Sequence, residues 1–262
     1  MNPARFLASL LAALPLLAGA AAPAAAERLI ISLSTHRVLI NSNFTGVELT
    51  LFGAIELDAA AVGRAGGYAL VVTVTGPRRT VTTWRKERVL GLWVNATYRT
   101  FVDPPSYLAV LTNRPINAIA DPAVLRRRQI GLNYFLLPQD LDGDVADAGA
   151  DDPYRQAFIR VKSEQGLYRE QTNAVTFLAP TLFRASIPLP ANVPVGGYEV
   201  DVTLFSGGAM IARESTAFEI IKAGFERHVA VAAREHGLLY GLATAALALL
   251  TGWLGSIVFR RE

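Results

Sequence analysis

Residues 189–198 read LPANVPVGGY, and together with the segment EVDVTL at 199–204 they form the stretch that decides the fold. Proline and glycine turn the chain at a corner, and Tyr198 then opens a new strand. Because side chains alternate between the two faces of a strand, we expect Tyr198 and every second residue after it to face inward. The Gly207-Gly208 pair predicts a hairpin into a further strand over Met210–Ile221.

Short β-prone segments recur on both sides of this corner, and turn residues separate many of them at intervals of about ten residues. These segments are Leu29–Leu33, Val38–Ile40, Phe44–Gly53, Tyr68–Thr75, Thr80–Trp84, Leu92–Thr97, Ala174–Leu178 and Leu182–Ile187. The spacing is typical of an antiparallel sandwich, and a tyrosine just after a Pro/Gly corner is typical of the immunoglobulin-like kind. The sequence therefore predicts a mainly β fold, an immunoglobulin-like antiparallel sandwich.

The middle of the chain predicts a partly helical insertion into this sandwich at about residues 103–172. Pro104-Pro105 end the strands, and Ser106–Thr112 is interpreted as a short helical turn. An Asp-Pro pair, suited to a helix start, precedes a predicted helix over Ala123–Gln129. Apolar residues at helical spacing predict a second helix over Pro153–Gln165.

Two apolar segments flank the predicted sandwich. Residues 1–26 carry an early arginine, an apolar run and small residues, which is the pattern of a signal peptide cleaved after Ala26. An uncleaved N-terminal anchor is the alternative. Leu238–Phe259 comprises twenty-two residues without a charge, enough to cross about 30 Å of hydrocarbon as a helix. The arginines of residues 260–262 agree with the tendency of positive charge to stay in the cytoplasm.

These segments predict a single-pass protein of the inner (cytoplasmic) membrane with its main domain in the periplasm. The predicted parts are a signal peptide (1–26), an exported β-sandwich domain (27–224), a juxtamembrane helix (225–237), a transmembrane helix (238–259) and a cytoplasmic tail (260–262). Two small domains are an alternative to one interrupted sandwich, because Gly66-Gly67-Tyr68 echoes Gly196-Gly197-Tyr198. The echo is too short to decide between them.

Composition limits the chemistry. The chain has no cysteine, which excludes disulfides, thiolate catalysis and cysteine-held metals. A net charge of +3 is small for 262 residues, and with the predicted compartment it argues against a nucleic-acid partner. The sequence predicts no enzyme, no catalytic residue, no metal site and no cofactor. The acidic loop Asp140–Asp151 partly imitates a calcium loop, but Val145 stands where that loop needs glycine, so a solvated loop is favoured and calcium stays open.

Arginine gathers in three runs, Arg78-Arg79, residues 85–88 and Arg126–Arg128. Guanidinium groups are planar donors that suit an anion, a lipid headgroup or an acidic partner. Within the second run, Arg85, Lys86 and Arg88 are the candidate contact residues. The alternative is that these charges keep a strand edge from pairing with a neighbour. Two tryptophans flank this run, Trp84 and Trp93, and both are expected in the core.

The predicted transmembrane helix carries small residues at every fourth position. The stripe consists of Thr244, Ala248, Gly252 and Ser256. Small side chains let helices approach closely in lipid, so the stripe is a candidate packing surface for an inner-membrane protein or for a second copy of the chain. In an alanine-rich chain such a stripe also arises by chance, and the helix then contacts only the lipid bilayer.

Several segments resemble the alphaproteobacterial transmembrane protein family. They are Ser42–Gly53, Arg85–Asn95, Leu189–Tyr198, Lys222–Arg227 and the closing Leu239–Arg261. The resemblance covers essentially the whole exported domain and the anchor, and it implies an exported β domain with a C-terminal anchor. It offers no catalytic residues.

Two classes of function follow from these features. The first is a non-enzymatic accessory or interaction protein that partners an inner-membrane protein, with a transporter as one candidate. The second is a tethered periplasmic binding module that holds a small anion or other ligand where the sandwich meets its insertion.

Overall fold

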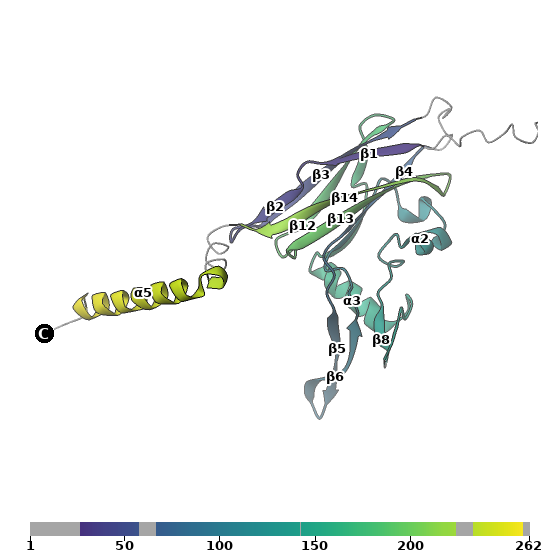
Figure 1. The fold of residues 1–262 in the computed structure, drawn as a ribbon. Coiled ribbons are helices and arrows are strands. Elements are labelled where there is room, and N and C mark those ends of the chain that lie inside the picture. The colour runs from purple at the N-terminus through teal and green to yellow at the C-terminus, as the bar shows by residue number, and fades with distance from the viewer. Residues whose placement is uncertain (1–26, 58–66, 142, 224–232, 259–262) are drawn as a thin grey trace, which may run out of the picture.

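The computed structural model describes residues 27–57, 67–141, 143–223 and 233–258 (Figure 1). The fold is mainly β, with two large sheets, a smaller third sheet and a separate C-terminal helix. The predicted signal peptide and cytoplasmic tail lie outside the described residues, as do residues 225–232 of the predicted juxtamembrane helix.

The first sheet has four strands in the order β1-β3-β12-β11, and every neighbouring pair is antiparallel. The strands are β1 (Arg28–Leu33), β3 (Gly46–Glu56), β12 (Leu182–Pro190) and β11 (Val175–Phe177). Alternate residues of β3, including Leu49, Leu51 and Ile55, are buried. One face of this sheet therefore lies on the core, as the alternation of β3 predicts.

The second sheet has six strands in the order β10-β7-β4-β13-β14-β2. The strands are β10 (Tyr168–Thr172), β7 (Leu108–Thr112), β4 (Ala69–Thr75), β13 (Gly196–Ser206), β14 (Ala209–Lys222) and β2 (Arg37–Ile40). The two outer pairs, β10 with β7 and β2 with β14, are parallel, and the inner pairs are antiparallel.

A single apolar core joins the two large sheets. On β13 the predicted inward residues are all buried; they are Tyr198, Val200, Val202 and Leu204. The Tyr198 hydroxyl donates a hydrogen bond to the Pro194 carbonyl over 2.6 Å, which confirms the predicted corner. Each sheet takes strands from both halves of the chain, so the two halves build one two-sheet unit.

Strand β4 is buried on both faces. Leu70, Val72 and Val74 belong to the core between the large sheets, whereas Ala69 and Val71 pack under a second apolar cluster. That cluster includes Leu125 of α2 (Pro122–Arg128), which covers the outer face of the six-stranded sheet. A strand covered on both faces reads as a continuous apolar run, which is what residues 69–74 show apart from Thr73.

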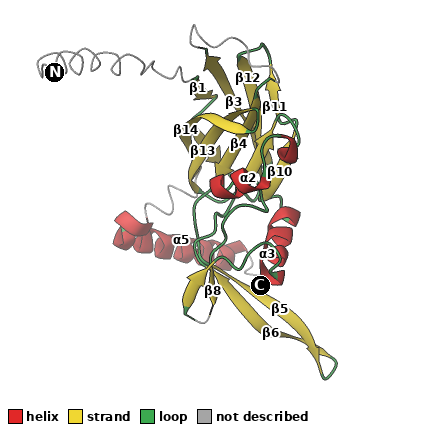
Figure 2. Ribbon diagram, turned by 90° about the vertical axis from the view of Figure 1, so that its right-hand side faces the viewer, coloured by secondary structure: helices red, strands yellow, loops and turns green. Residues whose placement is uncertain are grey.

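The third sheet holds β5 (Val81–Val89), β6 (Leu92–Phe101), β8 (Gln139–Leu141) and β9 (Asp144–Ala146). Strands β5 and β6 form a long hairpin that projects away from the two large sheets (Figures 1 and 2). Strand β8 pairs with β6 only at Thr100 and Phe101, so the outer part of the hairpin is a free two-stranded ribbon. The segments predicted as strands here are confirmed, but they lie outside the large sheets.

The predicted helical turn over Ser106–Thr112 is wrong, because Leu108–Thr112 form β7, which lies between β10 and β4 in the six-stranded sheet. Its apolar run is buried along its whole length, as is typical of a strand covered on both faces. The interruption expected at about 103–172 is therefore narrower, and residues 113–167 lie between β7 and β10.

Residues 113–167 hold a short 3-10 helix, η2 (Ile116–Ala118), followed by α2 and α3. The two predicted helices are confirmed as α2 and as α3 (Pro153–Glu164). Both helices begin at a proline, as the Asp-Pro pairs suggest.

The apolar helix predicted at the C-terminus is α5 (Gly237–Val258). Its stretch Gly237–Ser256 is long and apolar enough to cross a membrane. Leucine and alanine, both good helix formers, make up much of its length.

Candidate functional site

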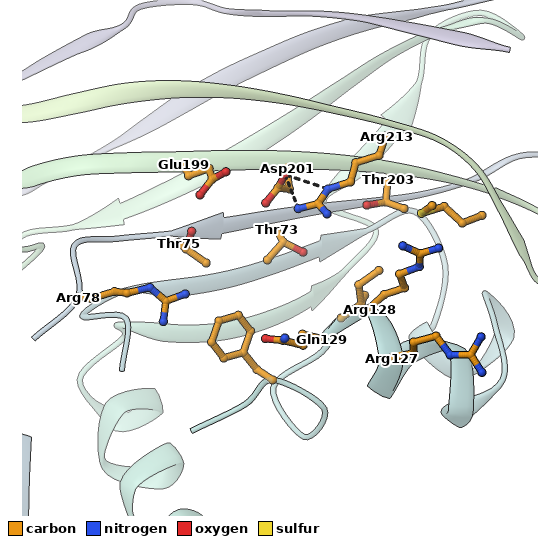
Figure 3. Close-up of a pocket in the computed structure, with 13 residues that line it drawn as sticks. Thr73, Thr75, Arg78, Arg127, Arg128, Gln129, Glu199, Asp201, Thr203 and Arg213 are labelled. Carbon is orange, nitrogen blue, oxygen red and sulfur yellow. Dashed lines mark hydrogen bonds and ion pairs between the residues drawn. The ribbon is translucent and has the colours of Figure 1, made fainter. Parts of the chain in front are cut away.

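A polar cleft of about 300 Å³ lies on the outer face of the six-stranded sheet, beside α2 (Figure 3). Its floor consists of outward-facing side chains of β4 and β13, among them Thr73, Thr75 and Thr203. Glu199 and Asp201 of β13 add two carboxylates. The outward face of these strands is thus apolar where α2 covers it and polar where the cleft opens.

Four arginines from three separate segments line this cleft. Arg78 follows β4, Arg127 and Arg128 end α2, and Arg213 lies on β14. The Arg213 guanidinium donates to Asp201 Oδ1 over 2.8 and 3.1 Å, and Arg78 Nη1 donates to the Asp103 carbonyl over 3.2 Å. Within the described residues, the side chains of Arg127 and Arg128 form no hydrogen bond or ion pair. Their guanidinium groups are therefore available to a ligand.

The end of α2 places these two arginines at the rim. Gln129 takes the left-handed conformation with φ 55°, and the Ile130 N–H donates to the Leu125 carbonyl over 2.9 Å. This is a common way to end a helix. Leu125 and Ile130 are buried in the apolar cluster, so they fix the helix end against the sheet. Basic residues in the last turn also suit the negative end of the helix dipole.

The cleft has the chemistry of a binding site for a small anion. Free guanidinium groups donate paired hydrogen bonds to carboxylate, phosphate or sulfate, and the threonine hydroxyls suit neighbouring oxygens. Its volume of about 300 Å³ lies at the lower limit of small-molecule pockets, which span about 300–1,000 Å³. Two of the three arginine runs in the sequence contribute to it, Arg78-Arg79 through Arg78 and Arg126–Arg128 through its last two residues.

The candidate residues Arg85, Lys86 and Arg88 do not reach the cleft, because they lie on the projecting hairpin. The structure also separates them. Arg85 Nε lies 3.5 Å from the Glu87 carboxylate, and the alternation of β5 puts these two on the opposite face from Lys86 and Arg88. A contact by this run remains a prediction, and it is distinct from the cleft.

The expectation that Trp84 and Trp93 lie in the core is wrong, because they are 50% and 70% exposed. Trp84 packs on Tyr98 across the hairpin, with ring centroids 4.9 Å apart. Both tryptophans belong to a two-stranded ribbon that neither large sheet covers. They are exposed because the hairpin projects away from the core.

The base of the hairpin is braced by α3. The Tyr154 hydroxyl hydrogen-bonds Thr97 Oγ1 over 2.6 Å, and Phe101 stacks on Phe158 with centroids 4.4 Å apart. The guanidinium of Arg99 lies over the Tyr154 ring at 5.3 Å. These contacts fix the direction of the hairpin and leave its outer part exposed.

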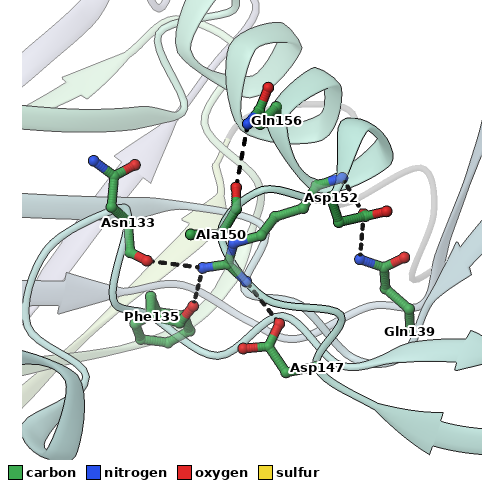
Figure 4. A network of polar contacts seen from close by, with 8 residues as sticks. Asn133, Phe135, Gln139, Asp147, Ala150, Asp152 and Gln156 are labelled. Atoms are coloured by element: carbon green, nitrogen blue, oxygen red, sulfur yellow. Dashed lines mark hydrogen bonds and ion pairs between the residues drawn. The ribbon is translucent and has the colours of Figure 1, made fainter.

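Near this base, polar contacts join the start of α3 to Asn133, Phe135 and Asp147 (Figure 4). Arg155 is 2% exposed, and its Nη1 forms an ion pair with Asp147 Oδ1 over 2.9 Å. Its Nη2 donates to the carbonyls of Asn133 and Phe135. The helical periodicity of α3 predicts that Arg155 points largely away from the buried side. The periodicity considers only apolar side chains, so it does not reveal an arginine that is buried through polar contacts.

The acidic loop at 140–151 contains the turn between β8 and β9. Asp140 Oδ1 accepts a hydrogen bond from the Gly143 N–H over 2.9 Å, and Asp147 is paired with Arg155. Asp142 lies outside the described residues. Among the residues that are described, no group of three or more His, Asp or Glu is placed to hold a metal.

The stripe on α5 is exposed at all four positions, Thr244, Ala248, Gly252 and Ser256. The Thr244 hydroxyl donates to the Tyr240 carbonyl of its own helix over 3.0 Å. Among the described residues, a Cβ added at Gly252 would meet no heavy atom within 4 Å beyond its own stretch of helix. The surface is therefore open to another helix, and its use stays a prediction.

Comparison with known families matches residues 28–261 to one family, described as "Putative transmembrane protein (Alph_Pro_TM)". The match runs from β1 through α5, so it covers the large sheets, the cleft, the hairpin and the apolar helix together. No curated protein matches the chain. Since the family model spans nearly the whole sequence, the resemblance seen in the sequence is confirmed, and the chain belongs to this transmembrane protein family.

Proposed function

We propose that this chain is a membrane-anchored, non-enzymatic binding module that holds a small anionic ligand in the cleft beside α2. The observation that carries the proposal is the convergence of Arg78, Arg127, Arg128 and Arg213 on one cleft. Asp201 holds Arg213 and the Asp103 carbonyl holds Arg78, so Arg127 and Arg128 are the guanidinium groups that remain to bind an anion.

The proposed location is the periplasmic side of the inner membrane. A C-terminal helix able to cross a membrane and the family match support the anchor. The sequence pattern of residues 1–26 supports export, and the arginines of residues 260–262 support a cytoplasmic C-terminus. A phosphatase reporter fused after Gly224 is expected to be active, and one fused after Glu262 inactive. The opposite result would reverse the proposed orientation.

We also propose that the two large sheets form an immunoglobulin-like sandwich. The order β1-β3-β12-β11 corresponds to strands A-B-E-D, and β2-β14-β13-β4-β7 corresponds to A′-G-F-C-C′. In this assignment Tyr198 opens strand F, and its hydroxyl bonds to the backbone four residues upstream, as in a tyrosine corner. Residues 76–107 and 113–167 then become insertions before and after strand C′.

Thermal unfolding of the full chain in detergent tests ligand binding, with inorganic phosphate and sulfate as probes against chloride at equal ionic strength. An anion that binds the folded state raises the melting temperature by mass action. We expect phosphate or sulfate to do so in the parent protein but not in a variant with Arg127→Gln and Arg128→Gln. Arg126→Gln is the matched control, because Arg126 lies on the same helix turn and does not line the cleft.

The response of the control decides the assignment. A melting shift that survives in the double variant, or that disappears equally in Arg126→Gln, would place anion binding elsewhere. No shift with either anion in the parent protein would count against a site for small oxyanions.

A second candidate function is that of an accessory subunit whose α5 packs against another inner-membrane protein or a second copy. Its support is the exposed stripe of small residues on α5, since close contact supplies the attraction between helices in lipid. Gly252→Leu is expected to reduce crosslinking to the neighbour in native membranes. Leu250→Ile is the control, because Leu250 lies on the opposite face of the helix from the stripe. Equal crosslinking from both variants would leave α5 as a tether only.

A further inference from the structure

The tip of the β5–β6 hairpin is apolar and exposed. Leu90 is 100% exposed, and Leu92 and Val89 are 71% and 50% exposed. Trp93 next to them is 70% exposed. Single exposed apolar residues are common on soluble proteins, but a group of this size at the end of a projecting element indicates a surface that meets something apolar.

The turn at the tip keeps a leucine where its backbone disfavours one. Leu90 and Gly91 have φ angles of 52° and 88°, which is the type I′ pattern of a two-residue hairpin turn. Asparagine or glycine suits the first of these positions, whereas a branched side chain is disfavoured in the left-handed region. The chain thus holds an apolar side chain in a disfavoured conformation without burying it, which points to a role outside the fold.

One face of the hairpin combines aromatic and basic side chains. Strand register pairs Trp84 with Tyr98 and Arg88 with Trp93, and paired residues share a face. The register shifts between Arg85 and Lys86 because β6 has an extra residue there, Ala96. The alternation of β5 itself continues, so Lys86 shares this face. Tryptophan and tyrosine gather at the headgroup level of bilayers, and lysine and arginine are attracted to anionic lipids.

The hairpin leaves the large sheets at the end from which the chain continues to α5. In the six-stranded sheet, Thr75 at the end of β4 pairs with Glu199, and Gly196 pairs with Ile220 near the end of β14. The hairpin follows directly after β4, and β14 leads toward α5. Both elements therefore start from the same end of the sandwich.

The hairpin and the segment that leads to α5 can extend over similar distances. The 9 residues of β5 span about 30 Å at about 3.3 Å per residue. The Ala223 N–H donates to the Ile40 carbonyl, and residues 233–235 are helical. The nine residues between them, 224–232, could span about 30 Å at most. A membrane that contains α5 thus lies within reach of the hairpin tip.

We propose that the hairpin tip, residues 88–94, inserts into the interface of the anionic bilayer that α5 crosses. Val89, Leu90 and Leu92 enter the region beneath the headgroups, and Trp93 lies at the headgroup level. Lys86 and Arg88 contact the lipid phosphates. With α5 this gives the domain a second membrane contact, which fixes its orientation above the bilayer.

Tryptophan fluorescence of the full chain in vesicles tests this insertion. The chain has three tryptophans, so Trp84→Phe with Trp253→Phe leaves Trp93 as the only one. Vesicles of phosphatidylcholine and phosphatidylglycerol carry bromine on the acyl chains near the headgroups. We expect these lipids to quench Trp93 emission and to shield it from aqueous iodide. A parallel protein with Trp84 as the only tryptophan is expected to be quenched less, because Trp84 lies farther from the tip.

Leu90→Asn is the decisive variant, because Asn-Gly is the favoured sequence of a type I′ turn. The hairpin therefore keeps its shape while the tip loses its apolar side chain, and quenching of Trp93 is expected to fall. Lys86→Gln with Arg88→Gln is expected to remove the dependence on phosphatidylglycerol. If brominated lipid leaves Trp93 unquenched in the parent protein, the proposal is wrong and the tip is left for a protein partner. Quenching that is equally strong in Leu90→Asn would also overturn it.

Discussion

Two aromatic regions of this molecule lie toward the same end of the sandwich and have opposite surroundings. In the interior, three tyrosines are almost fully buried, and each hydroxyl donates to the carbonyl of a proline. The pairs are Tyr107 with Pro188, Tyr168 with Pro105 and Tyr198 with Pro194. On the hairpin, Trp84, Trp93 and Tyr98 are at least half exposed. Burial is therefore decided by the sheet a strand joins and not by its aromatic residues.

The interior aromatic residues stabilise the fold, whereas those on the hairpin remain available for contact with another surface. The interior tyrosines pack against other aromatic rings. Tyr198 stacks on Phe218 with ring centroids 4.9 Å apart, and Tyr107 meets Tyr198 edge-on. Gly76 fits between two of them, since a Cβ there would lie 2.9 Å from atoms of Tyr107 and Tyr198. On the hairpin, aromatic side chains contribute little to the core and remain free for a second surface. Changes in the two regions should accordingly have different effects.

The largest expected effect is alkaline destabilisation, because it acts on all three interior tyrosines at once. Burial raises the pKa of Tyr107, Tyr168 and Tyr198. In the unfolded chain a tyrosine releases its proton near pH 10, whereas the folded protein holds these protons to higher pH. Above about pH 10 the unfolded state binds fewer protons, so the free energy of unfolding falls as pH rises.

Urea unfolding from neutral pH to about pH 11 measures this slope. Tyr168→Phe removes one of the three groups and is expected to flatten the slope above pH 10, although it lowers stability at neutral pH. A free energy of unfolding that stays constant through this range would show that the three hydroxyls are open to solvent.

The next effect in size comes from Arg155, which holds the base of the hairpin from behind. Arg155→Met keeps the length of the side chain but leaves Asp147 and two carbonyls without their donor. Because the Asp147 side chain is 24% exposed, the cost comes mainly from the two unsatisfied carbonyls, and the free energy of unfolding is expected to fall by about 2 kcal/mol. Arg160→Met on the same helix is the control, because its pair with Glu164 is exposed and 3.9 Å long, and such pairs contribute little. Similar losses from both variants would refute the role given to Arg155.

A matched pair of tyrosines compares the two regions directly. Tyr198→Phe removes a buried hydrogen bond and is expected to lower the free energy of unfolding by about 1 kcal/mol or slightly more. Tyr98→Phe, on the hairpin, removes a hydroxyl from a side chain that is 61% exposed and should change it little. Chemical denaturation of both variants tests the difference, and an unchanged Tyr198→Phe protein would contradict the corner.

The sequence predicts the interior better than it predicts the hairpin or the cleft. The corner at Tyr198 follows from residue order, because Pro/Gly turns and period-two alternation act locally. The apolar helix is predicted equally well, since length and composition alone identify a segment that can cross a membrane. Strand β7 is misread because a short apolar run fits a buried strand or a helical turn equally well.

The cleft needs information that the sequence does not display. Arg78, Arg127 and Arg213 are far apart along the chain, and only the strand order brings them together. The arginine runs do indicate candidate residues. The run on the hairpin is as long as the run on α2, so the sequence does not show which of the two lines a cleft. Likewise, Trp84 and Trp93 fit strands of a core until the register shows that their ribbon joins neither large sheet.

The smallest expected effect lies at the hairpin tip. There an apolar side chain that is exposed for contact occupies a turn position that another residue would stabilise better. Leu90→Asn places a residue suited to positive φ in the type I′ turn and should stabilise the hairpin by less than about 1 kcal/mol. Gly91→Ala should destabilise the hairpin, because the φ of 88° at this position disfavours any side chain.

Amide hydrogen exchange at the paired residues Val89 and Leu92 measures both changes locally, since the ribbon can open without unfolding the large sheets. Slower exchange in Leu90→Asn would mean that the natural tip is less stable than it could be, as expected if leucine is kept there for a contact. Faster exchange would mean that Leu90 supports the hairpin itself, and the contrast between the two aromatic regions would then weaken.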